Sequence, residues 1–234
     1  MVGIILAAGL GSRCKEITKK VHKALIEING KPHIEENIEY LLENGVEKVY
    51  IVIGYLKEQF YYLKDKYENV ELIENEYYRE YNNIYSMYKA LPYIDDGFIL
   101  MEADVVIHKK IKLPIKNKKA VIGTMLRNEK SKEWFPRIGK NGYVEKVDIT
   151  EEDSPCYIGL AYYSAEKVKL IKEEYKKYVN ENMDYEKLGL YWDDVVIGII
   201  EKLEIEVVEF PENTFTEIDN YDNYIDALKF SKIN

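Results

Sequence analysis

Short apolar runs alternate with amphipathic stretches along the first half of the chain. A short apolar run bounded by turn residues is typical of a buried strand, and apolar residues at helical spacing are typical of a helix. We therefore predict strands over residues 2–6, 48–54, 70–74 and 98–102, and helices over residues 32–44, 56–67 and 84–91. This alternation favours a parallel, doubly wound sheet, whose ligands bind at the carboxyl ends of the strands.

The pattern changes in the second half, where predicted strands follow one another more closely. We predict strands over residues 120–126, 142–148, 157–163 and 204–209, and helices over residues 165–180, 192–201 and 221–230. No Pro-, Gly- or Ser-rich linker separates the two halves. Residues 1–234 are therefore expected to form a single α/β domain.

Composition excludes several classes of protein. The chain has 234 residues, of which 47% are hydrophobic, and this is enough for a full core. Its net charge of −9 argues against nucleic-acid binding, which usually needs a clustered basic face. No apolar run approaches the roughly 20 residues of a membrane span, and the N-terminus lacks the basic segment of a secretory signal. Cys14 and Cys156 build neither a disulfide framework nor a zinc site. We expect a cytoplasmic protein without membrane insertion.

The first predicted strand leads into a turn of small residues, A-A-G-L-G-S at positions 7–12, followed by Arg13 and Lys23. Glycine permits close backbone approach and positive φ. Free N–H groups in such a turn bind anions, and nearby Arg and Lys add charge-assisted hydrogen bonds. The stretch predicts a loop that wraps a polyphosphate. The alternative is an ordinary strand–loop connection with incidental glycines.

Two familiar phosphate loops do not fit this stretch. A P-loop needs Gly-Lys-Ser/Thr, which is absent, and Cys14 occupies the third glycine position of a dinucleotide fingerprint. The string L-A-A-G-L-G-S-R followed by K-A-L instead resembles the signature of the nucleotidyltransferases that make NDP-sugars and CDP-alcohols. Two positions depart from it: the family usually has Pro at His22 and Leu at Cys14.

The resemblance implies a Rossmann-like α/β/α sandwich with a mostly parallel, mixed central sheet, of the nucleotide-diphospho-sugar transferase type. It implies that residues 1–110 mainly bind the nucleotide and residues 111–234 mainly bind the acceptor. In this family the loop wraps a nucleoside triphosphate, and an arginine and a lysine contact its phosphates. The matching catalytic positions are Arg13 and Lys23. The matching nucleotide-binding positions are Leu6, Ala7, Ala8, Gly9, Gly11 and Ser12.

Two aspartates are candidate metal ligands. Asp104 follows the predicted strand over residues 98–102, and Asp219 lies before the last predicted helix. Mg²⁺ prefers few carboxylates together with phosphate oxygens. The alternatives are that Asp104 caps a turn and that Asp219 is a helix N-cap. In the resembling family, aspartates at these two positions jointly bind the metal. Glu217 is a further candidate at the same site.

The segment Y-N-N-I-Y-S over residues 81–86 resembles the phosphocholine cytidylyltransferase branch of the family, in which this region lies against cytidine. Amides offer both a donor and an acceptor to a pyrimidine edge. Asn82, Asn83 and Ser86 are therefore candidate base and ribose contacts. The alternative is that the asparagines cap a helix.

Both tryptophans lie in polar strings, S-K-E-W-F at 131–135 and G-L-Y-W-D-D at 189–194. Aromatic faces bind quaternary ammonium groups. These strings also resemble the phosphocholine branch, which implies an acceptor site formed by Trp134, Tyr191, Trp192, Asp193 and Glu217. The alternative is that both tryptophans are packing residues.

The motifs together favour a Mg²⁺-dependent transfer of a cytidylyl group from CTP to phosphocholine or a related phosphorylated amine. Phosphoethanolamine and 2-aminoethylphosphonate remain open as acceptors. A sugar 1-phosphate is a further alternative, since Glu145-Lys146 resembles the E-K-P string of sugar nucleotidyltransferases, although Val147 replaces the proline. A catalytically silent nucleotide-binding regulator is the alternative from another class. The chain is expected to be a monomer or a homodimer.

Overall fold

A computed structural model describes residues 1–11, 18–127, 131–179 and 189–230 of the chain. Its centre is a seven-stranded sheet with the order β12-β8-β11-β6-β1-β4-β5. In chain order these strands are β1 (Val2–Ala7), β4 (Lys48–Ile53), β5 (Val70–Glu74), β6 (Phe98–Glu102), β8 (Ala120–Met125), β11 (Cys156–Tyr163) and β12 (Ile205–Phe210). β11 runs antiparallel to both of its neighbours, and the other pairs are parallel. The expected mixed, mostly parallel sheet is confirmed.

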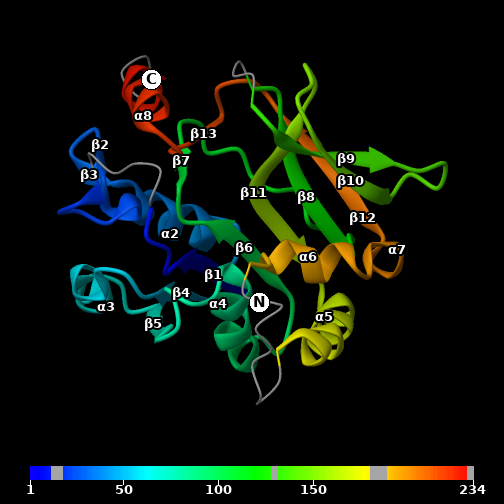
Figure 1. Ribbon diagram of the computed structural model, residues 1–234, viewed down its shortest axis with the longest axis horizontal. Coiled ribbons are helices and arrows are strands. Elements are labelled where there is room, and N and C mark those ends of the chain that lie inside the picture. The colour runs from blue at the N-terminus through cyan, green and yellow to red at the C-terminus, as the bar shows by residue number, and fades with distance from the viewer. Residues whose placement is uncertain (12–17, 128–130, 180–188, 231–234) are drawn as a thin grey trace.

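Helices cover both faces of this sheet (Figure 1). One face packs against α2 (His33–Glu43) and α3 (Tyr62–Lys66). The other packs against α4 (Asn83–Ala90), α5 (Ala165–Tyr178), α6 (Trp192–Ile197) and α7 (Ile200–Leu203). Successive strand residues point to opposite faces, so Ile4 belongs to one core and Ile5 to the other. Burial on both faces explains why the strands are continuous apolar runs in the sequence.

Two predicted helices are interrupted in the structure. Residues 56–67 form a 3₁₀ helix, η3 (Lys57–Phe60), and then the short α3. Leu56 has a left-handed φ of 50°, so it cannot begin a regular helix. Residues 192–201 divide into α6 and α7 because Ile199, with φ −128°, leaves the helical conformation. In both segments the apolar spacing was correct, but the backbone turns within it.

Four strands form two small paired sheets. β7 (Val105–Ile107) pairs with β13 (Phe215–Glu217), and β9 (Glu133–Ile138) pairs with β10 (Val144–Thr150). The sequence pattern missed β7, β9 and β13, and it predicted β10 over residues 142–148. The remaining elements are β2 (Glu27–Ile28), β3 (Lys31–Pro32), α8 (Tyr221–Phe230) and the 3₁₀ helices η2 (Lys23–Leu25) and η4 (Leu91–Tyr93). Figure 1 shows β7, β11 and β13 between α8 and the β9–β10 ribbon. Within the described part of the chain, no helix is both long enough and apolar enough to cross a membrane.

The β7–β13 pair joins the end of β6 to a segment far along the chain. Val105 lies opposite Glu217, and Ile218 N donates a hydrogen bond to Asp104 O at 3.0 Å. This antiparallel register places the residues just before β7 beside those just after β13. Asp104 and Asp219 are brought together by this pairing.

His108 follows β7 and gives a pH-dependent stability prediction. Burial, followed by the nearby Lys109 charge, lowers the pKa of His108 to about 4. The unfolded chain therefore binds this proton between about pH 6.5 and pH 4 while the folded chain does not, so stability falls on acidification. We expect the difference in unfolding free energy, wild type minus His108→Gln, to fall by about 2 kcal/mol from pH 7 to pH 4. This value allows for the partial exposure of the ring.

Urea unfolding of the two proteins at several pH values measures this difference. Gln keeps a group that can bond to the Thr216 hydroxyl, which lies 2.9 Å from His108 Nε2. A difference in unfolding free energy that does not change with pH would contradict the prediction.

Candidate active site

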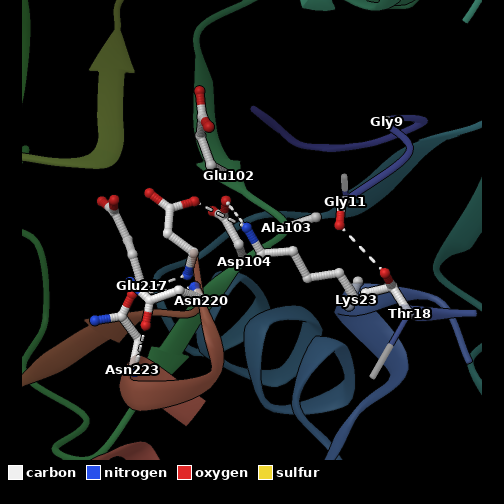
Figure 2. Close-up of polar contacts among 12 residues, drawn as sticks. Gly9, Gly11, Thr18, Lys23, Glu102, Ala103, Asp104, Glu217, Asn220 and Asn223 are labelled. Atoms are coloured by element: carbon white, nitrogen blue, oxygen red, sulfur yellow. Dashed lines mark hydrogen bonds and ion pairs between the residues drawn. The ribbon is translucent and has the colours of Figure 1, made fainter. Parts of the chain in front are cut away.

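Hydrogen bonds fix the described part of the loop after β1. Gly11 has φ +59°, a conformation that favours glycine, and its carbonyl accepts a hydrogen bond from Thr18 Oγ1 at 3.2 Å (Figure 2). Ala8 O accepts from Tyr55 N at 3.1 Å, which ties the start of the loop to the end of β4. Ala7, Ala8 and Leu6 precede the turn as the last residues of the strand and its exit. Ser12 and Arg13 lie outside the described residues.

Lys23 joins the two candidate metal ligands. Its Nζ lies 2.8 Å from Asp104 Oδ2 and 3.1 Å from Asp219 Oδ1, and Figure 2 shows the side chain reaching Asp104 from the loop side. The Lys23 side chain is only 12% exposed. Burial opposes its charge, but the two carboxylates outweigh burial and raise the pKa of Lys23. Burial also opposes ionisation of Asp104, yet the Lys23 ammonium lowers the pKa of that carboxyl.

The contacts of the two aspartates test the alternatives that Asp104 caps a turn and that Asp219 caps a helix. α8 begins at Tyr221, and Asn223 N donates to Asn220 Oδ1 at 2.9 Å, so Asn220 takes the position of the N-cap. The Asp219 carboxylate instead pairs with Lys23. Asp104 Oδ1 is buried and has no hydrogen-bond partner among the described residues. A buried, unpartnered carboxylate oxygen is costly unless a further group binds it.

A cavity of about 810 Å³ adjoins this pair. Its walls come from the ends of β6, β8 and β11, from β9 and β13, from the first turn of α6 and from one side of α8 along its length. The acidic side chains that line it are Glu102, Asp104, Glu133, Asp193, Glu217, Asp219, Asp222 and Asp226. Arg127 and Lys132 are the basic residues among its described lining. The cavity therefore favours a cationic guest.

Burial raises the pKa of several of these carboxyls. For Glu102, burial acts first and the neighbouring Asp104 and Asp193 charges add to it, so its pKa lies well above the ordinary value. Burial and the adjacent Asp194 raise the pKa of Asp193 in the same way. Burial raises the pKa of Glu217 to about 7, although the Arg127 guanidinium opposes this shift. A bound cation would relieve this concentration of negative charge.

Arg127 is a cavity residue that the sequence motifs did not indicate. Its Nη2 donates to Glu217 Oε1 at 2.6 Å and to Tyr157 O at 2.9 Å, and its Nη1 lies 3.3 Å from Glu133 Oε1. It thereby holds two acidic side chains of the cavity lining, one from β9 and one from β13. Its partner Glu217 lies 90 residues further along the chain, so no local spacing signals this contact.

The two tryptophans lie in different environments. Trp134 lines the cavity, and its ring meets Tyr191 edge-on with centroids 6.2 Å apart. Tyr191 is 45% exposed, and Asp193 and Glu217 share the same cavity. Trp192 is fully buried and packs edge-on against Tyr163 at 6.3 Å. Its Nε1–H donates to Glu102 Oε1 at 3.3 Å, so Trp192 packs behind the cavity wall. This differs from the prediction, which placed Trp192 in the acceptor site.

The expected base-binding residues are engaged within the protein. Asn82 Oδ1 accepts from Asn83 N at 2.8 Å and so caps α4. Asn83 Oδ1 accepts from Trp192 N at 2.8 Å, which joins α4 to α6. Ser86 is 3% exposed and accepts from Asn75 Nδ2 at 2.9 Å. The structure supports the helix-capping alternative for Asn82, and the burial of Ser86 does not support a ribose contact.

The departure from the family signature at His22 has a simple backbone explanation. His22 has φ −62° and ψ 143°, a conformation that proline also adopts. Histidine and proline can therefore share this backbone conformation, although proline would lose the hydrogen bond that His22 N donates to Gln59 Oε1. Cys14, the other departure, lies outside the described residues.

Comparison with known proteins places this arrangement in a family. A model of the MobA-like NTP transferase domain matches residues 3–111. The choline-phosphate cytidylyltransferase of Haemophilus influenzae is 38% identical over 98% of this chain and 97% of that protein. The 2-aminoethylphosphonate cytidylyltransferase of Lancefieldella rimae is 34% identical over 93% of this chain and 87% of that protein.

The same relationship appears in three dimensions. The solved structure of CTP:phosphocholine cytidylyltransferase from Streptococcus pneumoniae matches this fold with a TM-score of 0.88 and 33% identity, over 97% of both chains. This similarity confirms the Rossmann-like nucleotidyltransferase fold, and the sequence similarity extends over both halves of the chain. The chain therefore belongs to the nucleotidyltransferase family that includes the bacterial choline-phosphate cytidylyltransferases.

Proposed function

We propose that this protein transfers a cytidylyl group from CTP to phosphocholine and releases pyrophosphate and CDP-choline. The observation that carries the proposal is the meeting of Lys23, Asp104 and Asp219 between the glycine loop and an acidic, aromatic cavity. The loop side suits a triphosphate, and the cavity side suits a cationic acceptor. The similarity to choline-phosphate cytidylyltransferases supports the choice of both substrates.

The reaction needs positioning and charge neutralisation more than proton transfer. An oxygen of the phosphomonoester, already anionic near neutral pH, attacks the α-phosphorus of CTP. The new P–O bond forms as the bond from the α-phosphorus to the bridging oxygen breaks, and pyrophosphate leaves with that electron pair. Lys23 and Arg13 contribute positive charge to the triphosphate, and the loop N–H groups orient it. No nucleophilic side chain is required.

Asp104 and Asp219 would hold Mg²⁺. Within the described residues, no group of three His, Cys, Asp or Glu side chains forms a metal site alone. Mg²⁺ does not need one, since it commonly takes one or two carboxylates together with substrate phosphates and water. The buried, unpartnered Asp104 Oδ1 fits such a role. The ion would neutralise charge on the phosphates.

The acceptor half is assigned to residues 111–234 and the nucleotide half to residues 1–110. Trp134 and Tyr191 offer aromatic faces to a quaternary ammonium, and Asp193 and Glu217 offer negative charge. The same carboxylates would accept hydrogen bonds from a primary ammonium. 2-Aminoethylphosphonate is therefore the second candidate acceptor, supported by the Lancefieldella rimae relative.

We place the reaction in the cytoplasm, where CTP is available, and propose a monomer or a homodimer.

A substrate panel tests the proposed function. Purified protein is incubated with Mg²⁺, each nucleoside triphosphate and each of four acceptors: phosphocholine, phosphoethanolamine, 2-aminoethylphosphonate and a sugar 1-phosphate. Pyrophosphate release is expected to be fastest with CTP and phosphocholine. Turnover only with the sugar phosphate would refute the proposal, and nucleotide binding without any turnover would favour the regulator.

Trp134→Ala is expected to weaken acceptor binding selectively. An aromatic face contributes roughly 0.5–2 kcal/mol to binding of a quaternary ammonium, so KM for phosphocholine should rise about tenfold. KM for CTP should stay near its wild-type value because Trp134 lies on the acceptor side of the cavity. Steady-state kinetics with each substrate varied in turn measure both constants.

Tyr93→Ala is a suitable control because it removes an exposed aromatic ring outside the cavity. It should leave both KM values unchanged. Equal increases of both constants in Trp134→Ala would contradict the assigned acceptor role.

A further inference from the structure

The His22 ring bonds to two separate segments of the candidate active site. Its Nδ1 accepts a hydrogen bond from Ala24 N at 3.1 Å, and its Nε2 lies 3.2 Å from Gly9 O. A neutral imidazole carries one ring proton. Because Nδ1 is the acceptor, that proton is on Nε2, which donates to the Gly9 carbonyl. The ring therefore links the glycine loop to the turn that begins at Lys23.

The surroundings hold this ring in one position. His22 is 3% exposed, and its ring meets Phe60 edge-on with centroids 4.7 Å apart. Its backbone N–H donates to Gln59 Oε1 at 2.9 Å, and Gln59 Nε2 donates to Lys20 O at 2.7 Å. Burial lowers the pKa of His22 to about 4, so the ring is neutral at pH 7. The nearby charged or titratable groups are Lys23, Asp104 and His33.

The bond to Gly9 also orients the loop backbone. A trans peptide is planar, so the Gly9 carbonyl and the Leu10 N–H point in opposite directions. With the carbonyl bound by His22, the Leu10 N–H points away from the ring. The other bond fixes the start of η2, where the Lys23 side chain departs toward Asp104, 2.8 Å from its Nζ.

We propose that His22 is a positioning residue that locks the glycine loop to the Lys23 turn, so that the loop N–H groups and the Lys23 ammonium engage one triphosphate together. This inference rests on the proposed nucleotidyl transfer. It adds a residue that touches neither the phosphates nor the acceptor and acts through Gly9 and Lys23. The two ring nitrogens have separable tasks, orientation of the loop and capping of η2.

Two substitutions separate these tasks. The Asn side chain places an acceptor near the position of Nδ1 and can still cap Ala24, but it is too short to reach Gly9. The Gln side chain places a donor near the position of Nε2 and can still bind Gly9, but it loses the cap. Each variant is therefore the matched control of the other. The measurements are KM for each substrate, calorimetric titration with CTP and Mg²⁺, and the melting temperature.

His22→Asn is expected to raise KM and Kd for CTP about fivefold, the effect of one hydrogen bond, with KM for phosphocholine and the melting temperature near wild type. His22→Gln keeps the bond to Gly9, so it is expected to raise KM and Kd for CTP less than His22→Asn does and to melt about 2–4 °C lower. Unchanged CTP binding in His22→Asn, or equal effects of the two variants on every readout, would overturn the inference. If wild type turns over no acceptor, the proposed function fails, and the CTP titrations still decide the role of His22.

Discussion

Asp104→Ala is expected to reduce turnover about a thousandfold, because it removes a carboxylate that we propose holds Mg²⁺ at the triphosphate. The substitution deletes the buried Oδ1 that lacks a partner among the described residues, and it leaves Lys23 paired with the Asp219 carboxylate. Pyrophosphate release under saturating CTP and phosphocholine measures the effect. Addition of a chelator to wild type should have a comparable effect, and excess Mg²⁺ should reverse it.

Two variants separate chemistry from folding. Asp104→Asn keeps the shape of the side chain and removes its charge, so it should lose nearly as much turnover as Asp104→Ala. Asp65→Asn makes the same chemical change on the exposed surface of α3 and should leave turnover unchanged. Wild-type turnover in Asp104→Ala would remove the basis for the metal assignment.

Trp192→Ala is expected to destabilise the fold by about 3–5 kcal/mol, the usual effect of removing a large aromatic side chain from a core. Trp192 is fully buried among residues of α4, α5 and α6. The substitution also removes the indole N–H that donates to Glu102, a carboxyl already disfavoured by burial. Urea unfolding measures the loss, and Trp192→Phe should restore part of it.

Comparison with Trp134→Ala makes this prediction specific. Trp134→Ala should change the phosphocholine KM with little loss of stability, whereas Trp192→Ala should lower stability and impair both substrates together. A stable Trp192→Ala protein with a selective acceptor defect would mean that Trp192 contacts the acceptor directly.

Local signals accounted for most of the central sheet. The seven strands of that sheet were anticipated within one or two residues, because a strand buried on both faces is a continuous apolar run. The apolar pattern did not find the glycine loop or the two aspartates, which came from the small-residue turn and from the family resemblance. It missed β7, β9 and β13, whose short segments have little pattern of their own and are defined by their pairing partners.

Side-chain environment was less predictable than the backbone. Two tryptophans in similarly polar strings were given the same role, yet Trp134 lines the cavity and Trp192 is buried. Flanking polarity does not indicate burial here. Trp192 is the first residue of α6 and packs into the core, whereas the neighbouring Tyr191 and Asp193 line the cavity. Arg127 was missed for a related reason, since its carboxylate Glu217 comes from a remote strand.

The sequence alone determined the strand–helix alternation, the small-residue turn after β1 and the identity of the charged groups, because each depends on neighbours a few residues away. Only the tertiary structure decided that Asp104 and Asp219 share one lysine, that Glu217 faces Arg127 and that His22 joins two loops. The His22 bond to Gly9 spans only 13 residues, whereas the contacts of Asp104, Asp219 and Glu217 link segments far apart in the chain. They depend on the pairing of β7 with β13 and on packing around the sheet, which local spacing does not encode.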